Sequence, residues 1–449
     1  MREHRYLTRM TVSAPTRALD FGNPAALDAG LSAMAHGLRG SIILKIAAEV
    51  RELGASGRPL CNLTVGDFDP QQFPVPGPLR DLVVRALEAG ETNYPPSDGI
   101  LPLREAVVEY VGREHGVALP VGSVLITAGG RPAIYAAYRC IVDPGEAVLY
   151  SVPSWNNDYY AAMIGARELT VRARPECDFQ PTLGDLSPGL GEAKLLCLCS
   201  PGNPTGTVLP PQALREILEA VVEENGRRAA RGGPPLFVLH DLMYGSLVFG
   251  DRPHAHPLAL VPEAAPWVVT IDGISKAFAG TGLRVGWATG APPVIARMKD
   301  FLGHVGAWAP RPEQVATAAF LRDPAAIAAF RTGMHRALTE RLEALHAGFS
   351  RLKANGLPVD CVRPQGAMYL ALQLDLVGRK LAGVAIADNE SIRKLLLERA
   401  GFAVVPFQAF GLPEDSGWFR LSVGAVSVQD IKAVLPRLEH LLQEIARSE

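Results

Sequence analysis

The sequence lacks any apolar run near the roughly 20 residues that a transmembrane helix needs. Its N-terminus is basic at first but has no apolar segment of signal-peptide length. An excess of either charge is also missing, because 44 Lys and Arg residues stand against 46 Asp and Glu residues, for a formal net charge of −2. Such a chain would not attract a nucleic acid or a membrane surface over a wide area. We therefore expect no nucleic-acid partner and no membrane partner.

Cysteine is scarce, and paired cysteine motifs are absent. None of the six cysteines has the two-residue spacing of a zinc site. Cys197 and Cys199 alternate in an apolar run, which is typical of small buried side chains in a strand. His254 and His256 stand in a proline-containing loop without an evident third ligand, and we interpret this loop as solvated. We expect no metal site, and a reducing, cytoplasmic compartment.

What the chain does have is length and an ordinary globular composition. Its 449 residues are too many for one simple core and fit two domains, or one large domain with a split smaller one. With 48% hydrophobic and 20% charged residues, the composition is typical of a soluble enzyme.

Five short apolar runs alternate with helical patterns in the middle of the chain. The runs are VLIT at 124–127, AVLYSV at 147–152, LLCLCS at 195–200, LFVLHD at 236–241 and WVVTID at 267–272. Several are nearly continuous in apolar residues, as strands are when both faces of a mostly parallel sheet are covered. Helical patterns between them, for example at 133–141 and 211–225, predict an α/β fold with a mostly parallel sheet between helices.

The two ends of the chain predict a second, smaller domain. A long amphipathic stretch at 325–352, later apolar runs and a last helix from Val428 favour an α+β unit. A helical pattern at 42–53 would complete this unit from the N-terminal side. The predicted division is an N-terminal arm at 1–30, the small domain at 31–75 and 326–449, and the large domain at 76–325.

A lysine stands just beyond the last of the five runs. Lys276 lies in a Gly- and Ser-rich turn, with Arg284 eight residues later. Desolvation at a buried strand end lowers the pKa of a lysine and makes it a better nucleophile toward an aldehyde. Taken alone, a lysine beside glycine is more often a surface residue.

Three further motifs precede this lysine in the chain. SPGNPTG places Asn203 just beyond a strand, where α/β folds bind ligands, although it is also compatible with a simple turn. Asp241 ends another strand, with Tyr244 three residues on. Its carboxylate needs a partner, such as a protonated ring nitrogen, unless it caps a helix. Gly129 and Gly130 open a helix whose backbone N–H groups could seat a phosphate.

In this order, the motifs resemble those of the class I and II aminotransferases, which are fold-type-I enzymes that use pyridoxal 5′-phosphate (PLP). The resemblance extends from about Leu38 to the C-terminus. SPGNPTG and DGISKAFAGTGLRVGW are its most specific motifs, and NYPPSDGILPLREAV and FRLSVG match two further segments. It implies a large PLP-binding domain and a smaller α+β domain built from both chain ends.

The resemblance implies a catalytic or cofactor-binding role for each motif residue. Lys276 would form a Schiff base with PLP and then carry a proton, and Asp241 would pair with the pyridine nitrogen. Tyr244 and Asn203 would hydrogen-bond the oxygen on the cofactor ring. The other implied cofactor contacts are Gly130, Arg131, Ser275 and Arg284 around the phosphate, Trp155 on the ring face, and Tyr94 on the phosphate of a second subunit.

The resemblance also implies how a substrate would bind. Arg420 would form a bidentate pair with the α-carboxylate, with Asn203 and the backbone of Gly66 beside it. Some aspartate-active members carry Lys where this chain has Arg131, which implies a contact with the distal carboxylate of aspartate or glutamate. Contact with the phosphate or with solvent is the alternative for Arg131.

A second subunit would contribute to each site. Because Tyr94 matches a residue that reaches the neighbouring subunit, the resemblance implies a homodimer with shared active sites. We hypothesise that Trp308 and Arg311 shape side-chain selection in the partner's pocket. One departure is Gly273, which stands where some members place a phosphate-binding Ser.

We predict a PLP-dependent aminotransferase that moves the amino group of an amino acid, aspartate or glutamate, to a 2-oxo acid. One alternative keeps the cofactor and changes the reaction to that of a lyase or a decarboxylase. Another is a non-catalytic ligand-binding regulator on the same fold, against which the intact set of Lys276, Asp241 and Arg420 argues.

Overall fold

The computed structural model describes most of the chain. The described residues are 19–38, 40–55 and 57–448. Contacts divide the chain into one unit of residues 1–39 and another of residues 40–449. None of the described helices is both long enough and apolar enough to cross a membrane.

The first unit contains two short helices. These are α1 (Pro24–Ala29) and α2 (Ala33–Gly37), and neither buries a side chain. Of the arm predicted at 1–30, residues 1–18 lie outside the described part of the chain. We keep the arm as a proposal.

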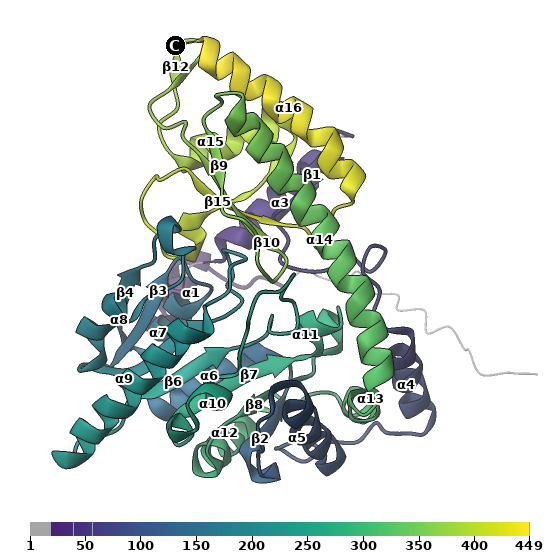
Figure 1. Ribbon diagram of the computed structural model, residues 1–449, viewed down its shortest axis with the longest axis vertical. Coiled ribbons are helices and arrows are strands. Elements are labelled where there is room, and N and C mark those ends of the chain that lie inside the picture. Colours follow the sequence, from purple (N-terminus) through teal and green to yellow (C-terminus); the bar gives the residue numbers. More distant parts are fainter. Residues whose placement is uncertain (1–18, 39, 56, 449) are drawn as a thin grey trace, which may run out of the picture. The chain divides into compact units, whose positions relative to one another are not determined.

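The second unit is built on a seven-stranded, mostly parallel sheet (Figure 1). In spatial order its strands are β2 (Val124–Thr127), β8 (Gly286–Thr289), β7 (Val268–Gly273), β6 (Phe237–Asp241), β5 (Ala193–Cys199), β3 (Ala147–Val152) and β4 (Arg167–Arg172). β8 runs antiparallel to both of its neighbours, and the other neighbouring pairs are parallel. The predicted α/β class is confirmed.

Helices cover both faces of this sheet. Alternate residues of a strand point to opposite faces, so Leu196 packs in one core and Leu195 in the other. The first core takes in α4 (Gly77–Glu88), α5 (Leu101–His115), α8 (Leu183–Leu190), α9 (Pro211–Ala230), α10 (Pro257–Leu260) and α13 (Arg311–Leu321). The second takes in α6 (Gly130–Ile141), α7 (Asn157–Ile164) and α12 (Pro292–Val305), and it extends to α3 (Ile42–Ala55) and to residues of a second sheet, such as Val405 and Trp418.

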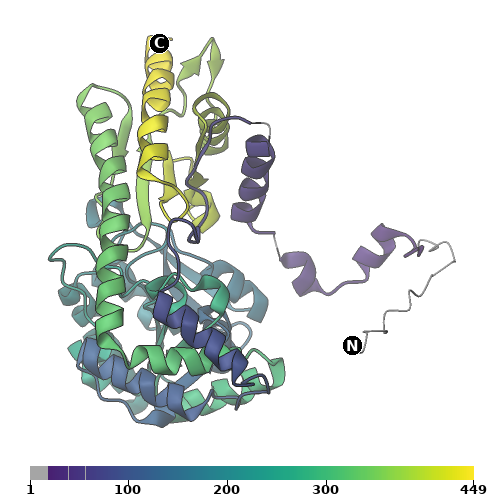
Figure 2. The ribbon, with the colours of Figure 1, turned by 90° about the vertical axis from the view of Figure 1, so that its right-hand side faces the viewer.

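A smaller antiparallel sheet has its own core. Its spatial order is β14 (Val405–Pro406), β15 (Trp418–Ser422), β10 (Tyr369–Leu374) and β9 (Val359–Cys361). The long helices α14 (Pro324–Ala354) and α16 (Val428–Arg447) run side by side against it (Figure 2). Further elements include α15 (Asn389–Leu395) and the two-stranded pairs β1 (Cys61–Asn62) with β13 (Phe402–Ala403) and β11 (Lys380–Leu381) with β12 (Val384–Ala385).

Local sequence explains how the two long helices begin. Asp323 caps α14 by accepting the N–H of Ala326 at 2.9 Å. Ser427 and Asp430 form a reciprocal capping box at the start of α16.

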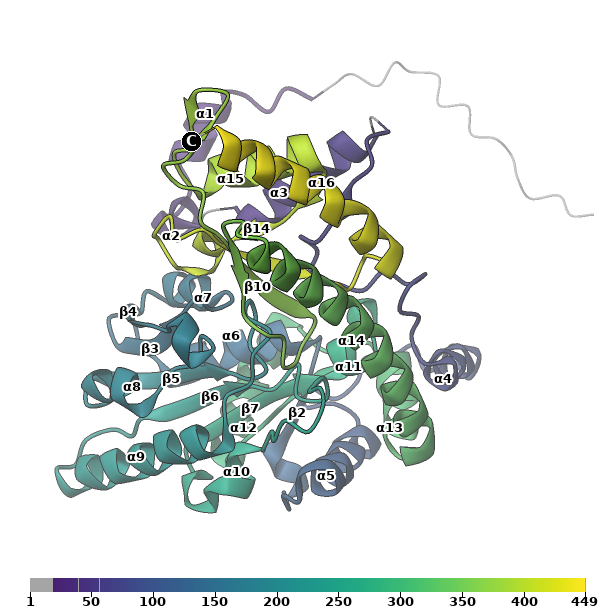
Figure 3. The same cartoon turned by 45° about the horizontal axis from the view of Figure 1, so that its top comes forward.

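α14 reaches from α13, beside the large sheet, to α16 (Figure 3). We propose that these two sheets mark the large and small domains predicted at 76–325 and at 31–75 with 326–449.

The sequence patterns located most elements but not all. All five apolar runs are strands, but β4 and β8 have no such run. β4 lies at the sheet edge with alternate residues exposed, and β8 is only four residues long and begins with glycine.

Four histidines gather on the face of β6 opposite to Asp241. His240 is fully buried, and neither ring nitrogen has a hydrogen-bond partner among the described residues. The rings of His256 and His115 lie 5.3 Å apart, and His254 Nε2 lies 3.1 Å from the carbonyl oxygen of Ser200. The described residues include no group of three side chains suited to a metal ion.

The interpretation of His254 and His256 as a solvated loop is wrong. His256 is only 2% exposed. The reason is that the next two residues, Pro257 and Leu258, are buried in α10, so that the preceding loop packs against the core beside the sheet. Burial lowers the pKa of His240 and of His256 to about 3.

This histidine cluster predicts a loss of stability in acid. An unfolded histidine titrates near pH 6.5 and His240 near pH 3, so stability is complete above about pH 6.5 and falls as the pH drops between these values. At pH 5 each such histidine costs about 2 kcal/mol. We expect His240→Leu to lose less stability than wild type between pH 7.5 and pH 5 in denaturant unfolding, whereas His440→Leu, 70% exposed on α16, should behave as wild type. Equal acid losses in all three proteins would contradict this account.

Candidate active site

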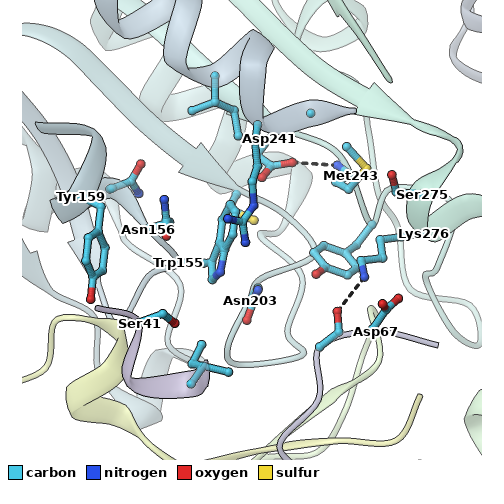
Figure 4. Close-up of a pocket in the computed structure, with 18 of the residues that line it drawn as sticks. Ser41, Asp67, Trp155, Asn156, Tyr159, Asn203, Asp241, Met243, Ser275 and Lys276 are labelled. Carbon is cyan, nitrogen blue, oxygen red and sulfur yellow. Dashed lines mark hydrogen bonds between the residues drawn. The ribbon is translucent and has the colours of Figure 1, made fainter. Parts of the chain in front are cut away.

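A cavity of about 630 Å³ opens at the carboxyl ends of the central strands of the large sheet. Ligands bind at this edge in α/β folds because loops from neighbouring strands meet there. Eleven residues singled out in the sequence line it: Gly66, Gly130, Arg131, Trp155, Asn203, Asp241, Tyr244, Ser275, Lys276, Arg284 and Arg420. In the view of Figure 4, Trp155 and Lys276 lie on opposite sides, with Asp241 above and Asn203 below.

Lys276 extends from the short helix α11 (Ile274–Ala277), directly after β7. Its Nζ donates a hydrogen bond to the carbonyl oxygen of Gly66 at 2.7 Å (Figure 4). Burial lowers the pKa of this lysine to about 8, and the charge of Asp67 opposes that change. The amine is therefore easier to deprotonate than an exposed lysine and is suited to nucleophilic attack.

Asp241 ends β6 and is partly buried. One carboxylate oxygen accepts the backbone N–H of Met243 at 2.9 Å. Burial raises the pKa of this carboxyl to about 6. No cationic side chain among the described residues pairs with it. A carboxylate that is removed from water and has no cationic side chain beside it would be stabilised by a cationic group of a ligand.

Tyr244 and Asn203 reach the cavity from the loops that follow β6 and β5. The hydroxyl oxygens of Tyr244 and Tyr369 lie 2.7 Å apart. The amide oxygen of Asn203 accepts a hydrogen bond from Nη1 of Arg420 at 3.2 Å. Both residues are buried, so their positions are fixed by packing as well as by these bonds.

The start of α6 forms an anion seat. Gly129 precedes it with φ +82°, and no side chain caps its open N–H groups. The Arg284 guanidinium donates to the carbonyl oxygen of Ala128 at 2.8 Å, and a Cβ atom at Gly129 would lie 2.2 Å from its Nη2 atom. Only glycine leaves room for this arginine beside the helix terminus.

The departure at Gly273 also has a structural reason. A Cβ atom there would lie 2.7 Å from Cα of Gly286 and 2.8 Å from the carbonyl oxygen of Val285. β7 and β8 thus approach too closely for a serine. Ser275, which is 7% exposed and lines the cavity, is the available hydroxyl.

Two further arginines line the cavity without a carboxylate partner among the described residues. Arg420 is 1% exposed, and its guanidinium lies 4.9 Å from each of the ring centres of Tyr369 and Phe410. The Arg131 guanidinium lies 4.6 Å from the ring centre of Trp155. Both cations are held by aromatic faces and are open to an anionic ligand.

Tyr94, Trp308 and Arg311 do not line this cavity. Tyr94 is 82% exposed, and its ring meets the ring of Trp308 edge-on at 5.3 Å. Arg311 pairs with Glu91. The structure thus places these three residues outside the cavity.

Sequence reasoning missed several cavity residues. Tyr369 stands in MYLALQL, one of the later apolar runs, which favoured only an α+β unit. Asp67 follows Gly66 in the loop TVGDFDP, so its charge beside a glycine with an implied substrate contact was the available signal. The start of α3 also lines the cavity, at Ser41, Ile42, Ile43 and Leu44, and no motif marks it.

The side chains that line the cavity fit PLP. A desolvated lysine suits an aldehyde, and a buried carboxylate without a cation suits a protonated pyridine nitrogen. The glycine-lined start of α6, with Arg284, suits a phosphate. Tyr244 and Asn203 supply hydrogen-bond donors for an oxygen on the ring.

Comparisons with known proteins agree with this geometry. The sequence model of the family described as "Aminotransferase class I and II" matches residues 58–438. The aspartate aminotransferase of Streptomyces avermitilis is 31% identical over 92% of this chain and 97% of its own. The aspartate/prephenate aminotransferase of Thermus thermophilus is 30% identical over 92% of this chain and 99% of its own.

Solved structures are similar as well. A double mutant of Thermus thermophilus aspartate aminotransferase has a TM-score of 0.81 at 30% identity, covering 92% of this chain and 99% of that one. The Thermus thermophilus enzyme with maleate also has a TM-score of 0.81, at 29% identity and the same coverage.

Replacement of Asp241 tests whether its carboxylate pairs with the ring nitrogen of PLP. We expect Asp241→Asn to weaken PLP binding about 10- to 100-fold, because a hydrogen bond to a charged group is lost. The measurement is PLP dissociation followed by absorbance and equilibrium dialysis.

A matched control lies on the neighbouring strand. The pKa of Asp272 is raised by burial to about 8, so its carboxyl is already neutral at pH 7, and it does not line the cavity. Asp272→Asn should bind PLP as wild type does. Unchanged PLP affinity in Asp241→Asn would contradict the assignment.

Proposed function

The chain belongs to the class I and II aminotransferase family, whose enzymes use PLP, and on that premise we propose that it transfers the amino group of aspartate or glutamate to a 2-oxo acid. The predicted family, aminotransferase activity and cofactor are confirmed by the match over residues 58–438 and by the named relatives. Those names do not favour the lyase, decarboxylase or regulator alternatives.

The observation that supports this choice of substrate is a pair of cavity arginines without carboxylate partners among the described residues. Arg420 and Arg131 line one cavity, and neither has a carboxylate partner among the described residues. An amino acid with two carboxylates would satisfy both, whereas a neutral amino acid would leave Arg131 unmatched. The similar Thermus thermophilus enzyme was solved with maleate, which is itself a dicarboxylate.

The chain's own side chains have distinct tasks in this reaction. PLP, when bound, withdraws electrons from the α-carbon of the amino acid, so that its proton can leave. The Lys276 amine, with its lowered pKa, takes this proton and returns it. Asp241 holds a positive charge on the ring nitrogen, while Arg420 fixes the α-carboxylate and so orients the bond to be broken.

We propose the remaining contacts from the same cavity. Gly130, Ser275 and Arg284 would hold the phosphate, and Trp155 would lie against the ring. Tyr244 and Asn203 would donate to the ring oxygen, and the backbone of Gly66 would lie beside the substrate carboxylate. We also propose a cytoplasmic enzyme, which suits its six free cysteines.

A homodimer with shared sites would give the exposed aromatic residues a function. Tyr94 is 82% exposed although it is a large aromatic side chain, and Trp308 packs edge-on against it. In a twofold dimer, Tyr94 would reach the partner's phosphate, and Trp308 with Arg311 would border the partner's substrate pocket.

Loss of Arg131 tests the substrate proposal. We expect Arg131→Ala to lower kcat/KM for aspartate or glutamate about 10- to 100-fold, because a charge-assisted hydrogen bond is lost, and to change kcat/KM for alanine far less. The measurement is steady-state transamination of each donor with 2-oxoglutarate, with products identified by mass.

Arg139→Ala is the matched control, because Arg139 is exposed on the same helix and does not line the cavity. It should keep wild-type kinetics with every donor. If the ratio of acidic to neutral kcat/KM values stayed unchanged in both Arg131→Ala and Arg311→Ala, the proposed selection of acidic side chains would be wrong.

Mixing two inactive variants tests the shared site. In dimers of Lys276→Ala with Tyr94→Ala, one of the two sites has both residues intact. After unfolding and refolding an equimolar mixture, random pairing should restore about a quarter of the activity of wild type treated in the same way. Activity of the mixture no greater than the mean of the separate variants would overturn the shared site.

A further inference from the structure

We infer that Tyr369 is a positioning residue that fixes the direction of the Tyr244 hydroxyl proton and so lets Tyr244 donate into the cavity. The inference rests on the proposed role of Tyr244 at the ring oxygen of PLP, and it assigns to Tyr369 a function that no motif marks. Tyr369 begins β10 of the small sheet, whereas Tyr244 follows β6 of the large sheet.

The contact between the two tyrosines is direct and shielded from solvent. Their hydroxyl oxygens lie 2.7 Å apart, and the ring centres lie 5.5 Å apart at 70°. Tyr369 is 1% exposed and Tyr244 6%. Both line the cavity, so the pair forms part of the wall that faces the cofactor seat.

The number of hydroxyl protons indicates which tyrosine donates this hydrogen bond. Each hydroxyl has one proton, and the geometry allows either oxygen to be the donor. If Tyr244 donated to Tyr369, it would present only lone pairs to the cavity, which an anionic ring oxygen would repel. If Tyr369 donates, the Tyr244 proton is free to point at that oxygen. Among the described residues Tyr369 has no other hydroxyl partner, so nothing competes for its proton.

The protonation states permit either direction, so the choice rests on the anionic ring oxygen that Tyr244 would face. Burial raises the pKa of Tyr244 well above its ordinary value, and burial also raises the pKa of Tyr369. Both hydroxyls are therefore protonated throughout the working pH range, and each has a proton to donate.

The ring of Tyr369 has a second task that its hydroxyl does not share. The Arg420 guanidinium lies 4.9 Å from the ring centre. Nη2 of Arg420 donates to the carbonyl oxygen of Thr64 at 2.7 Å. Phenylalanine would keep the aromatic face and lose only the hydroxyl, so Tyr369→Phe separates proton orientation from the support of Arg420.

The test is a double-mutant cycle on Tyr244→Phe and Tyr369→Phe in the PLP-loaded enzyme. The readout is the pH at which the absorbance of the bound cofactor changes, which reports the proton on the nitrogen supplied by Lys276. A donor to the ring oxygen stabilises its negative charge and lowers this pH. We expect Tyr369→Phe to raise it by about 0.5 to 1 unit, because one neutral hydrogen bond is weakened.

Because Tyr369 acts through Tyr244, the double variant should match Tyr244→Phe rather than show the sum of two shifts. KM for aspartate should stay within about twofold in Tyr369→Phe while kcat falls about 3- to 10-fold. Tyr135→Phe, which removes a hydroxyl outside the cavity, should match wild type in both measurements.

The outcomes separate the two claims. Additive shifts, or no shift in Tyr369→Phe when Tyr244→Phe shifts, would overturn the inference about Tyr369. No shift in Tyr244→Phe would overturn the proposed role of Tyr244 and this inference with it. Neither result depends on whether aspartate is the substrate, because the absorbance is measured without one.

Discussion

The concentration of positive charge in one cavity is the constraint on which the rest of the structure depends. Lys276, Arg131, Arg284 and Arg420 all line it, and among the described residues no carboxylate pairs with any of the three arginines. Burial is the main cause that lowers the pKa of Lys276; the charge of Asp67 opposes it, and the three arginines add to it. Anionic ligands would offset this charge, and a phosphate together with a dicarboxylate would do so.

The fold provides this arrangement by bringing distant segments to one sheet edge. Parallel strands end at the same edge, so the residues that follow β5, β6 and β7 meet there although many residues separate them. Arg420 and Tyr369 come from the small sheet. The cavity therefore depends on both sheets.

Much of the site could be predicted because its residues stand in motifs where strands end. Lys276, Asp241 and Asn203 all follow continuous apolar runs, and the runs reflect burial on both faces. Tyr369 could not be found this way, since its own run gives no sign that its hydroxyl faces a cavity. The burial of His256 was missed because it depends on tertiary contacts of Pro257 and Leu258. The exclusion of serine at Gly273 depends on β8, a strand without a recognisable pattern.

The central claim is that the buried amine of Lys276, and no other, forms the covalent bond with PLP. Borohydride reduction of the PLP-loaded protein, followed by proteolysis and peptide mass spectrometry, tests it most directly. The account predicts a single phosphopyridoxyl group, located on Lys276 in the peptide that contains GISKAF. Attachment to another lysine, or no attachment when PLP is bound, would contradict it.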